Sequence, residues 1–257
     1  VSSVMGLLAL LVGFTFSLAV VTYLDRVCIS AAAPFMMTEL HLSVWQMSIV
    51  FSAFTLAYSL FEVPSGWLGD RIGARRVLTR IVLWWSAFTA FTGMAWSYVS
   101  LYVIRFLFGA GEAGALPNAG RVIASWFPAS ERGRMQGLML ASAQVGGVLA
   151  PVATAWLIDK TGWRLAFSVF AFAGFAWATG FWWWFRDNPH EHPRVNAAEL
   201  ELLRENEQNA TGHGNVPWRL LFSRPSVWLL WLTTGAYLLT AVDLWAGGRT
   251  GLAALLD

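Results

Sequence analysis

Two charged residues that share a helix face lie inside an apolar stretch that is long enough to cross a membrane. The stretch covers residues 98–127 and contains Arg105 and Glu112, whereas a bilayer takes roughly 20 apolar residues. The two charges are about two helical turns apart, so they project from nearly the same helix face. An ionisable side chain at membrane depth costs about 3 kcal/mol or more and by default marks a substrate or proton path. We expect this face to look onto a polar cavity; the alternative is a structural ion pair that locks two helices together.

Glycines in the same stretch have the spacing of a nucleotide-binding motif. Gly109, Gly111 and Gly114 spell G-x-G-x-x-G, which binds dinucleotides when it follows a strand within a βαβ unit. Here the apolar run simply continues through the motif. We therefore expect these glycines to let another helix approach closely, and we expect Pro117 to kink the helix.

The composition is that of an integral membrane protein. Hydrophobic residues make up 57% of the chain and charged residues 12%, about half the charged fraction of a soluble domain. The mean hydropathy is +0.55. We expect an all-α membrane protein in which residues 1–185 form a six-helix transmembrane bundle. The expected spans are residues 11–37, 45–68, 77–96, 98–127, 135–158 and 165–185.

Several classes of function are excluded by the residues available. Cys28 is the only cysteine and the four histidines lack ligand spacing, so we expect no disulfide, metal site or cofactor. No nucleophile, base and orienting group come together as an enzyme requires. The sequence pI of about 9.0 comes from loop arginines, which we interpret as membrane orientation and not as nucleic-acid binding.

Arginines are concentrated in alternate loops. They follow the second and fourth expected spans and the sixth, whereas the other loops are nearly uncharged or balanced. By the positive-inside rule the N-terminus is cytoplasmic. Residues 186–224 then form a cytoplasmic linker with a short amphipathic helix at 197–208, and residues 225–257 form part of a seventh span and a divergent tail.

The most specific motif is the short loop expected over residues 66–78. It contains an acid, Asp70, several arginines and glycines at turn positions. Glycines permit a tight turn, and the arginines mark the cytoplasmic side. A purely topogenic loop would explain the arginines but not the acid and glycines. The residues of this motif are Gly66, Asp70, Arg71, Gly73, Arg75 and Arg76.

Three further polar residues lie inside apolar spans. Tyr58 and Glu62 belong to the second span, and Glu62 lies so near its end that an interfacial or interhelical role is favoured over that of a buried functional acid. Gln144, in the fifth span, could hydrogen-bond a ligand or join two helices. The residues alone leave these two roles of Gln144 equally open.

Together these motifs resemble the major facilitator superfamily and, within it, the anion:cation symporter family. The loop at residues 66–78 is similar to the superfamily's signature, and six spans followed by a long linker resemble half of such a transporter. The narrower resemblance rests on Asp25-Arg26, Ala33-Pro34, Arg105-x-x-x-Gly109-x-x-Glu112 and residues 125–132. It covers roughly residues 25–224.

The resemblance implies a proton-coupled organic anion symporter for sugar acids or related carboxylates, located in the inner cell membrane. Asp25 and Glu112 would bind protons, and Arg26 and Arg105 would pair with them or with the substrate carboxylate. Tyr58 and Gln144 would line the anion site. The lone thiol of Cys28 stands where many relatives have asparagine.

Members of this family have twelve spans, whereas this chain reaches only the seventh. The sequence departs from the family after about residue 233, within the seventh span. We therefore expect a truncated transporter that lacks its C-terminal half and is inactive alone. The alternative is a non-transporting or homodimerising half-transporter.

Overall fold

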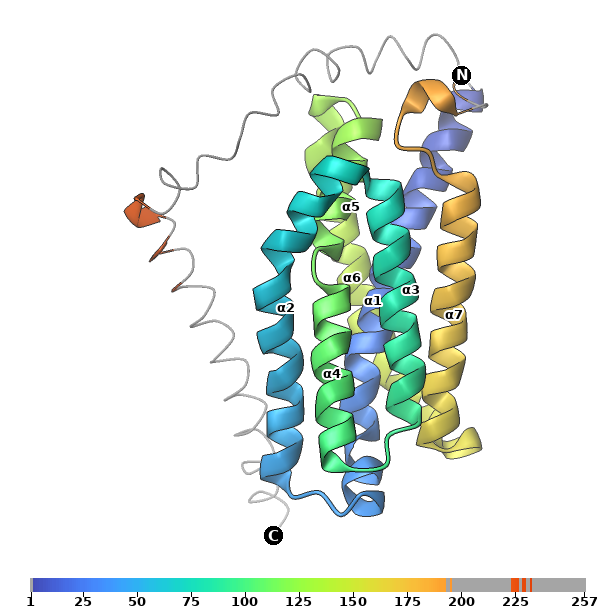
Figure 1. Cartoon of the computed structure of the whole chain (residues 1–257). Coiled ribbons are helices and arrows are strands. Elements are labelled where there is room, and N and C mark those ends of the chain that lie inside the picture. Colours follow the sequence, from blue (N-terminus) through green and yellow to red (C-terminus); the bar gives the residue numbers. More distant parts are fainter. Residues whose placement is uncertain (1, 193–194, 196–222, 227, 230–231, 233–257) are drawn as a thin grey trace, which may run out of the picture. The chain divides into compact units, whose positions relative to one another are not determined.

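The computed structural model describes residues 2–192, 195, 223–226, 228–229 and 232 (Figure 1). The described residues contain seven α-helices and one 3₁₀-helix and no strand, which confirms the all-α fold. Five of the expected spans are single helices, and the fourth is divided into two. The elements are α1 (Ser2–Glu39), α2 (Val44–Ile72), α3 (Ala74–Gly93), α4 (Tyr98–Glu112), α5 (Ala115–Trp126), α6 (Ala129–Thr161), α7 (Trp163–Trp184) and η1 (Pro189–Glu191).

Length and composition allow five helical segments of the described part to cross a membrane. They lie in α1, α2, the combined α4–α5 segment, α6 and α7. Helix α3 falls outside this set, and its first two turns contain Arg75, Arg76 and Arg80. The first helix is longer than expected, since it begins at Ser2 and not near residue 11.

Hydrogen bonds at the helix starts explain two of the sharp turns. Ser43 accepts a hydrogen bond from the backbone N–H of Gln46, and the Gln46 side chain accepts one from Ser43 N. Ser97 and Ser100 make the same reciprocal pair before α4. Each pair satisfies backbone donors that a helix start leaves without partners, so α2 and α4 begin directly after short connections.

The helices pack side by side along the bundle (Figure 1), with α1 parallel to α6, α2 parallel to α4 and α3 antiparallel to α7. Helix α1 packs mainly on α6, α3 on α7, and α2 on α4, while α3 also contacts α4. Two apolar clusters fill the interior. One is centred on Trp85, Phe108 and Phe181, and the other on Met36, Leu101 and Phe167.

The glycine motif serves helix packing, as expected. A Cβ atom at Gly109 would lie 2.4 Å from the carbonyl oxygen of Phe54 in α2, and one at Gly111 would overlap the ring of Trp84 in α3. These contacts are possible only without a side chain. The motif therefore joins α4 to two neighbours, which excludes the nucleotide-loop reading of these glycines.

The fourth span is broken, not merely kinked. Helix α4 ends at Glu112, Gly114 adopts the left-handed region (φ 86°, ψ 1°), and α5 starts at Ala115. A proline in a helix cannot donate a backbone hydrogen bond to the carbonyl group four residues before it, and its ring clashes with that group. For Pro117 this is the carbonyl group of Ala113. The interruption therefore precedes Pro117 by one turn and directly follows Glu112.

The expected loop at residues 66–78 is wrong in extent. Helix α2 continues to Ile72 and α3 begins at Ala74, so Gly73 alone separates them, with φ 90° and ψ 151°. One residue in a conformation open mainly to glycine makes the whole turn. Asp70 and Arg71 consequently lie in the last turn of α2, and Arg75 and Arg76 in the first turn of α3.

The chain divides into two compact units, residues 1–209 and 210–257. In the second unit the described residues from Pro225 onward are helical. The amphipathic helix expected at 197–208, and most of the linker and of the seventh span, lie outside the described residues.

Candidate functional site

Four charged residues from α1 and α4 meet inside the bundle. Asp25, Arg105 and Glu112 are 1–2% exposed. Arg26 Nε donates a hydrogen bond to Glu112 Oε1 over 2.5 Å, which forms an ion pair between α1 and α4. The structural ion pair that was the alternative for Glu112 is therefore present.

Aromatic rings of α2 support the Arg26 side chain. Its guanidinium carbon lies 4.8 Å from the ring centre of Tyr58 and 5.5 Å from that of Phe54. Attraction between the cation and the ring faces holds the guanidinium beside Glu112. Tyr58, expected at the anion site, thus lies in this group of residues.

Asp25 is tied to α3. Its Oδ1 atom accepts a hydrogen bond from the hydroxyl group of Thr89 over 3.3 Å, and the Cys28 thiol donates to its backbone carbonyl over 3.1 Å. Among the described residues, Oδ2 has no hydrogen-bond partner. One acceptor of a buried carboxyl group is therefore left unsatisfied, which is costly.

Arg105 is the least satisfied member of the group. Its guanidinium carbon lies 4.9 Å from the ring centre of Phe108 and 5.7 Å from that of Phe167. No ion pair joins it to a carboxylate of the described residues, and its Nε and Nη2 atoms lack hydrogen-bond partners there. A buried cation of this kind is usually paired.

A cavity of about 40 Å³ adjoins both arginines. Besides Arg26 and Arg105 it is lined by apolar side chains of α1, α2 and α4: Ile29, Val50, Phe51, Phe54 and Phe108. The expected polar cavity is therefore small and polar on the arginine side, and Glu112 is not part of its lining.

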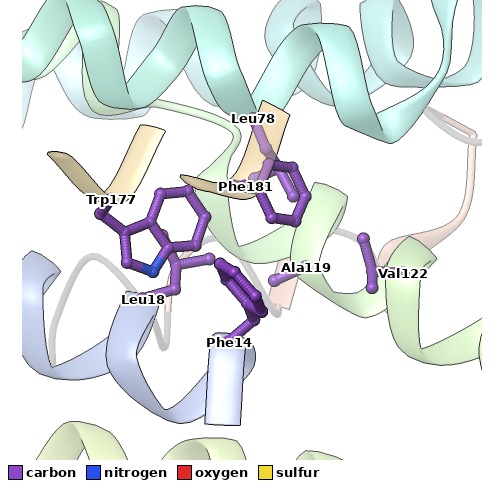
Figure 2. A pocket seen from close by; sticks show the side chains of 7 residues that line it. All are labelled: Phe14, Leu18, Leu78, Ala119, Val122, Trp177 and Phe181. Atoms are coloured by element: carbon purple, nitrogen blue, oxygen red, sulfur yellow. The ribbon is translucent and has the colours of Figure 1, made fainter. Parts of the chain in front are cut away.

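A second internal void differs from this cavity in its size and its lining. It measures about 10 Å³ and is lined only by uncharged, largely apolar residues of α1, α3, α5 and α7 (Figure 2). Figure 2 shows Phe14, Trp177 and Phe181 packed around it. This void is a packing defect of the core, whereas the cavity at the arginines offers donors to a ligand.

The other expected site residues are placed differently. Gln144 lies exposed on α6. Glu62 is half-buried and lies inside α2, which continues ten residues beyond it to Ile72. That Gln144 lines the anion site stays a prediction.

The signature residues join helices at one end of the bundle. Asp70 forms an ion pair with Arg121 of α5. Arg71 stacks over Trp67 at 4.1 Å, and Arg75 donates from Nε to the carbonyl oxygen of Trp182 over 3.1 Å. Their charges fasten α2 to α5 and α3 to α7.

Residues that the sequence reasoning missed complete this end. Asp187 Oδ1 accepts a hydrogen bond over 2.8 Å from the backbone N–H of Arg75, so it caps α3, whose own N-cap, Gly73, has no side chain. Asn118 is buried and donates to the carbonyl oxygens of Gly114 and Ser65. Polar residues inside apolar runs were a usable signal for Asn118 and Thr89, but nothing local identifies Asp187.

Comparison with known proteins agrees with this fold. Residues 15–251 match the family model described as Major Facilitator Superfamily. Two solved structures share the fold. The bacterial homolog of the human lysosomal transporter Spinster, inward-facing and occupied, has a TM-score of 0.62 at 24% identity, with coverage of 72% of this chain and 45% of that one. The proton:xylose symporter XylE has a TM-score of 0.65 at 13% identity, with coverage of 82% and 55%.

Curated relatives are transporters of organic acids. The probable sulfoacetate transporter SauU of Cupriavidus necator is 37% identical over 83% of this chain and 49% of its own length. The probable galactarate/D-glucarate transporter GarP of Escherichia coli K12 is 36% identical over 74% and 44%. The hexuronate transporter of Bacillus subtilis is 32% identical over 69% and 42%. The chain spans about half the length of these relatives.

These relatives agree with the resemblance to the anion:cation symporter family. They are transporters and not enzymes. The helical bundle with five segments long and apolar enough to cross a membrane, its signature residues and the match over residues 15–251 lead to one assignment: the chain belongs to the Major Facilitator Superfamily and covers the N-terminal half of its fold.

Proposed function

We propose that this bundle binds a small organic anion at Arg105 and couples its transport to a proton carried by Asp25 or Glu112. The observation that carries the proposal is the buried guanidinium of Arg105, with two nitrogen atoms unsatisfied beside a cavity. A carboxylate or sulfonate group supplies the missing hydrogen-bond acceptors. The relatives named for sugar acids and sulfoacetate support this substrate class.

The net charge of the four residues is the reason why we expect anion binding to be coupled to proton binding. Asp25 and Glu112 balance Arg26 and Arg105, so the group is neutral when all four are ionised. A bound monoanion adds one negative charge in a site that water screens poorly. Protonation of one carboxyl group restores neutrality, and each carboxyl group has an unsatisfied oxygen to hold the proton.

The anion needs more room than the present cavity provides. A cavity of about 40 Å³ accommodates about one water molecule, whereas small-molecule pockets are several hundred Å³. We propose that this bundle forms one wall of the site and that a second six-span bundle, as in the longer relatives, forms the other. Binding between two such halves is the general arrangement of these transporters.

The location follows from the arginine-bearing helix ends. The end with Arg71, Arg75 and Arg76 is proposed to face the cytoplasm of a cell (inner) membrane, with the N-terminus on the same side. Cysteine labelling of Ser43→Cys and Ser130→Cys from either side of intact cells tests this orientation, because the two exposed positions lie at opposite ends. Labelling of Ser130→Cys from outside contradicts it.

The direct test measures anion and proton binding together. The purified chain in weakly buffered detergent is titrated with monoanionic hexuronates, glucuronate or galacturonate, while pH and thermal stability are recorded. We expect stabilisation by the anion, uptake of up to one proton per anion, and loss of both in Arg105→Gln. Unchanged binding and proton uptake in Arg105→Gln contradicts the proposal.

A second measurement asks whether the half is sufficient. Uptake of the same anions is compared for this chain alone and for a fusion to the C-terminal half of GarP. We expect proton-dependent uptake only by the fusion, and its loss in Glu112→Gln and Asp25→Asn. Uptake by the chain alone as a stable dimer supports the homodimerising half-transporter instead.

A further inference from the structure

A groove between α3 and α7 lies outside the charged group described above. It has a volume of about 730 Å³. Its lining comes only from α3 and the last turns of α7: Arg76, Thr79, Arg80, Leu83, Trp84, Ala87, Ala178, Thr179, Trp182 and Trp183. We propose that this groove binds one anionic glycerophospholipid, with its phosphate group at Arg76 and Arg80 and one acyl chain along the apolar part.

The distribution of lining residues matches such a molecule. The two arginines lie at the start of α3, and the lining becomes apolar beyond them. Arg76 and Ala87 are eleven residues apart, which is about 16 Å along a helix. One leaflet of the hydrocarbon core is about 15 Å thick, so the groove has the depth of a single acyl chain.

The charge of the groove favours an anion. Arg76 and Arg80 are both exposed and are the only charged residues in its lining. Arg80 Nη2 donates to the hydroxyl group of Ser65 over 3.1 Å, which leaves its other N–H groups available. The carboxylate of Asp187 lies at the same helix end but is bound to the backbone of Arg75.

Tryptophans mark the level of the headgroups. Trp182 and Trp183 lie 40% and 79% exposed at the end of α7, and tryptophan is enriched where the hydrocarbon core meets the headgroups. Arg75 stacks on Trp182 at 4.2 Å and so adds positive charge at the rim. Arginine and tryptophan at one level, with an apolar groove below, favour a lipid over a soluble anion.

The test is native mass spectrometry of the purified full chain in detergent. Phosphatidylglycerol, phosphatidylcholine with the same acyl chains, and glycerol 3-phosphate are added separately. We expect one phosphatidylglycerol to be retained, about fivefold weaker retention for Arg76→Gln or Arg80→Gln, and about 25-fold for both together, since each basic residue near an anionic headgroup contributes about one such factor. Glycerol 3-phosphate alone is expected not to bind.

Matched variants separate charge from shape. Arg134→Gln removes an exposed arginine of α6 outside the groove and should leave retention unchanged. Leu83→Trp fills the groove without altering charge and should abolish retention, whereas Arg80→Lys should preserve most of it. Equal retention of the two phospholipids, no effect of the double substitution, or binding of glycerol 3-phosphate as strong as that of the lipid overturns the proposal.

Discussion

Two charged clusters of the bundle differ in how well their hydrogen-bonding groups are satisfied. At one end, Glu39 accepts from Trp163 Nε1 over 2.6 Å with one oxygen and from Arg164 Nε over 2.9 Å with the other. Arg164 also donates to the carbonyl oxygen of Gly93. In the middle, Asp25, Arg105 and Glu112 each retain polar atoms without partners in the described part.

This difference distinguishes the cluster at Glu39, which links helices, from the central charged group, which can bind a ligand. The cluster at Glu39 is partly exposed and joins three helices, and both oxygen atoms of its carboxylate already have partners. The central group is buried and incomplete, which costs stability. Unsatisfied buried charge is tolerated in membrane proteins mainly where it serves function.

The largest effect should come from breaking the buried ion pair. Arg26→Leu leaves Glu112 buried without its partner, and we expect the free energy of unfolding to fall by about 3–5 kcal/mol. Unfolding of the purified chain in mixed micelles measures it. The double variant with Glu112→Gln should recover much of the loss, because the uncompensated charge is gone; equal losses in single and double variants would falsify the pairing.

The next effect distinguishes function from stability at Arg105. Arg105→Gln should change the melting temperature of the chain little, because one of the two buried carboxyl groups can take up a proton in place of the lost positive charge, yet weaken anion binding about 30-fold or more, as expected when one member of a desolvated charge pair is lost. Arg164→Gln is the matched control. If Arg105→Gln instead lowers stability and leaves anion binding intact, Arg105 is a structural residue and the comparison with Glu39 collapses.

A smaller effect is expected at the signature end. Asp187→Ala removes the cap of α3 and should cost about 0.5–2 kcal/mol, whereas Asp187→Asn keeps an acceptor and should cost little. Hydrogen exchange at the first amides of α3 gives a local readout. Asn188→Ala, which affects only the cap of η1, should leave that exchange unchanged; faster exchange there in the control as well would argue against a specific cap.

The smallest effect should be that of Glu39→Gln. Its ion pair with Arg164 is partly exposed, so we expect a loss of about 0.2–1 kcal/mol that disappears at high salt. Unfolding at low and high ionic strength measures it. Uptake by the fusion should not change, and a large loss of uptake would show that this cluster takes part in transport.

Most residues of the central charged group could be predicted from the sequence, because charged residues inside apolar runs are conspicuous. Arg105 and Glu112 identified the central group, and their family resemblance added Asp25 and Arg26. The sequence could not show that Glu112 pairs with Arg26 while Arg105 remains without an ion pair, since that depends on how α1 and α4 are rotated against each other. Whether Gln144 faces the same group also depends on rotation, and here it lies exposed.

The errors at element boundaries have a common cause. Gly73 and Gly114 each turn the chain within one or two residues, so the predicted loop at 66–78 was too long and the predicted kink at Pro117 was one turn too late. Local composition indicates that a turn exists but not how few residues it needs. The cap of α3 by Asp187 depends on a residue more than a hundred positions away, which no local pattern reveals.

The sequence separation between Arg75 and Asp187 implies a delay during synthesis of the chain. The acceptor for Arg75 N lies 112 residues downstream. A ribosome that adds about 5–20 residues per second needs about 6–22 s to reach it. Until then α3 lacks this cap, so the hydrogen bond between Arg75 and Asp187 can form only after all of α7 has been synthesised.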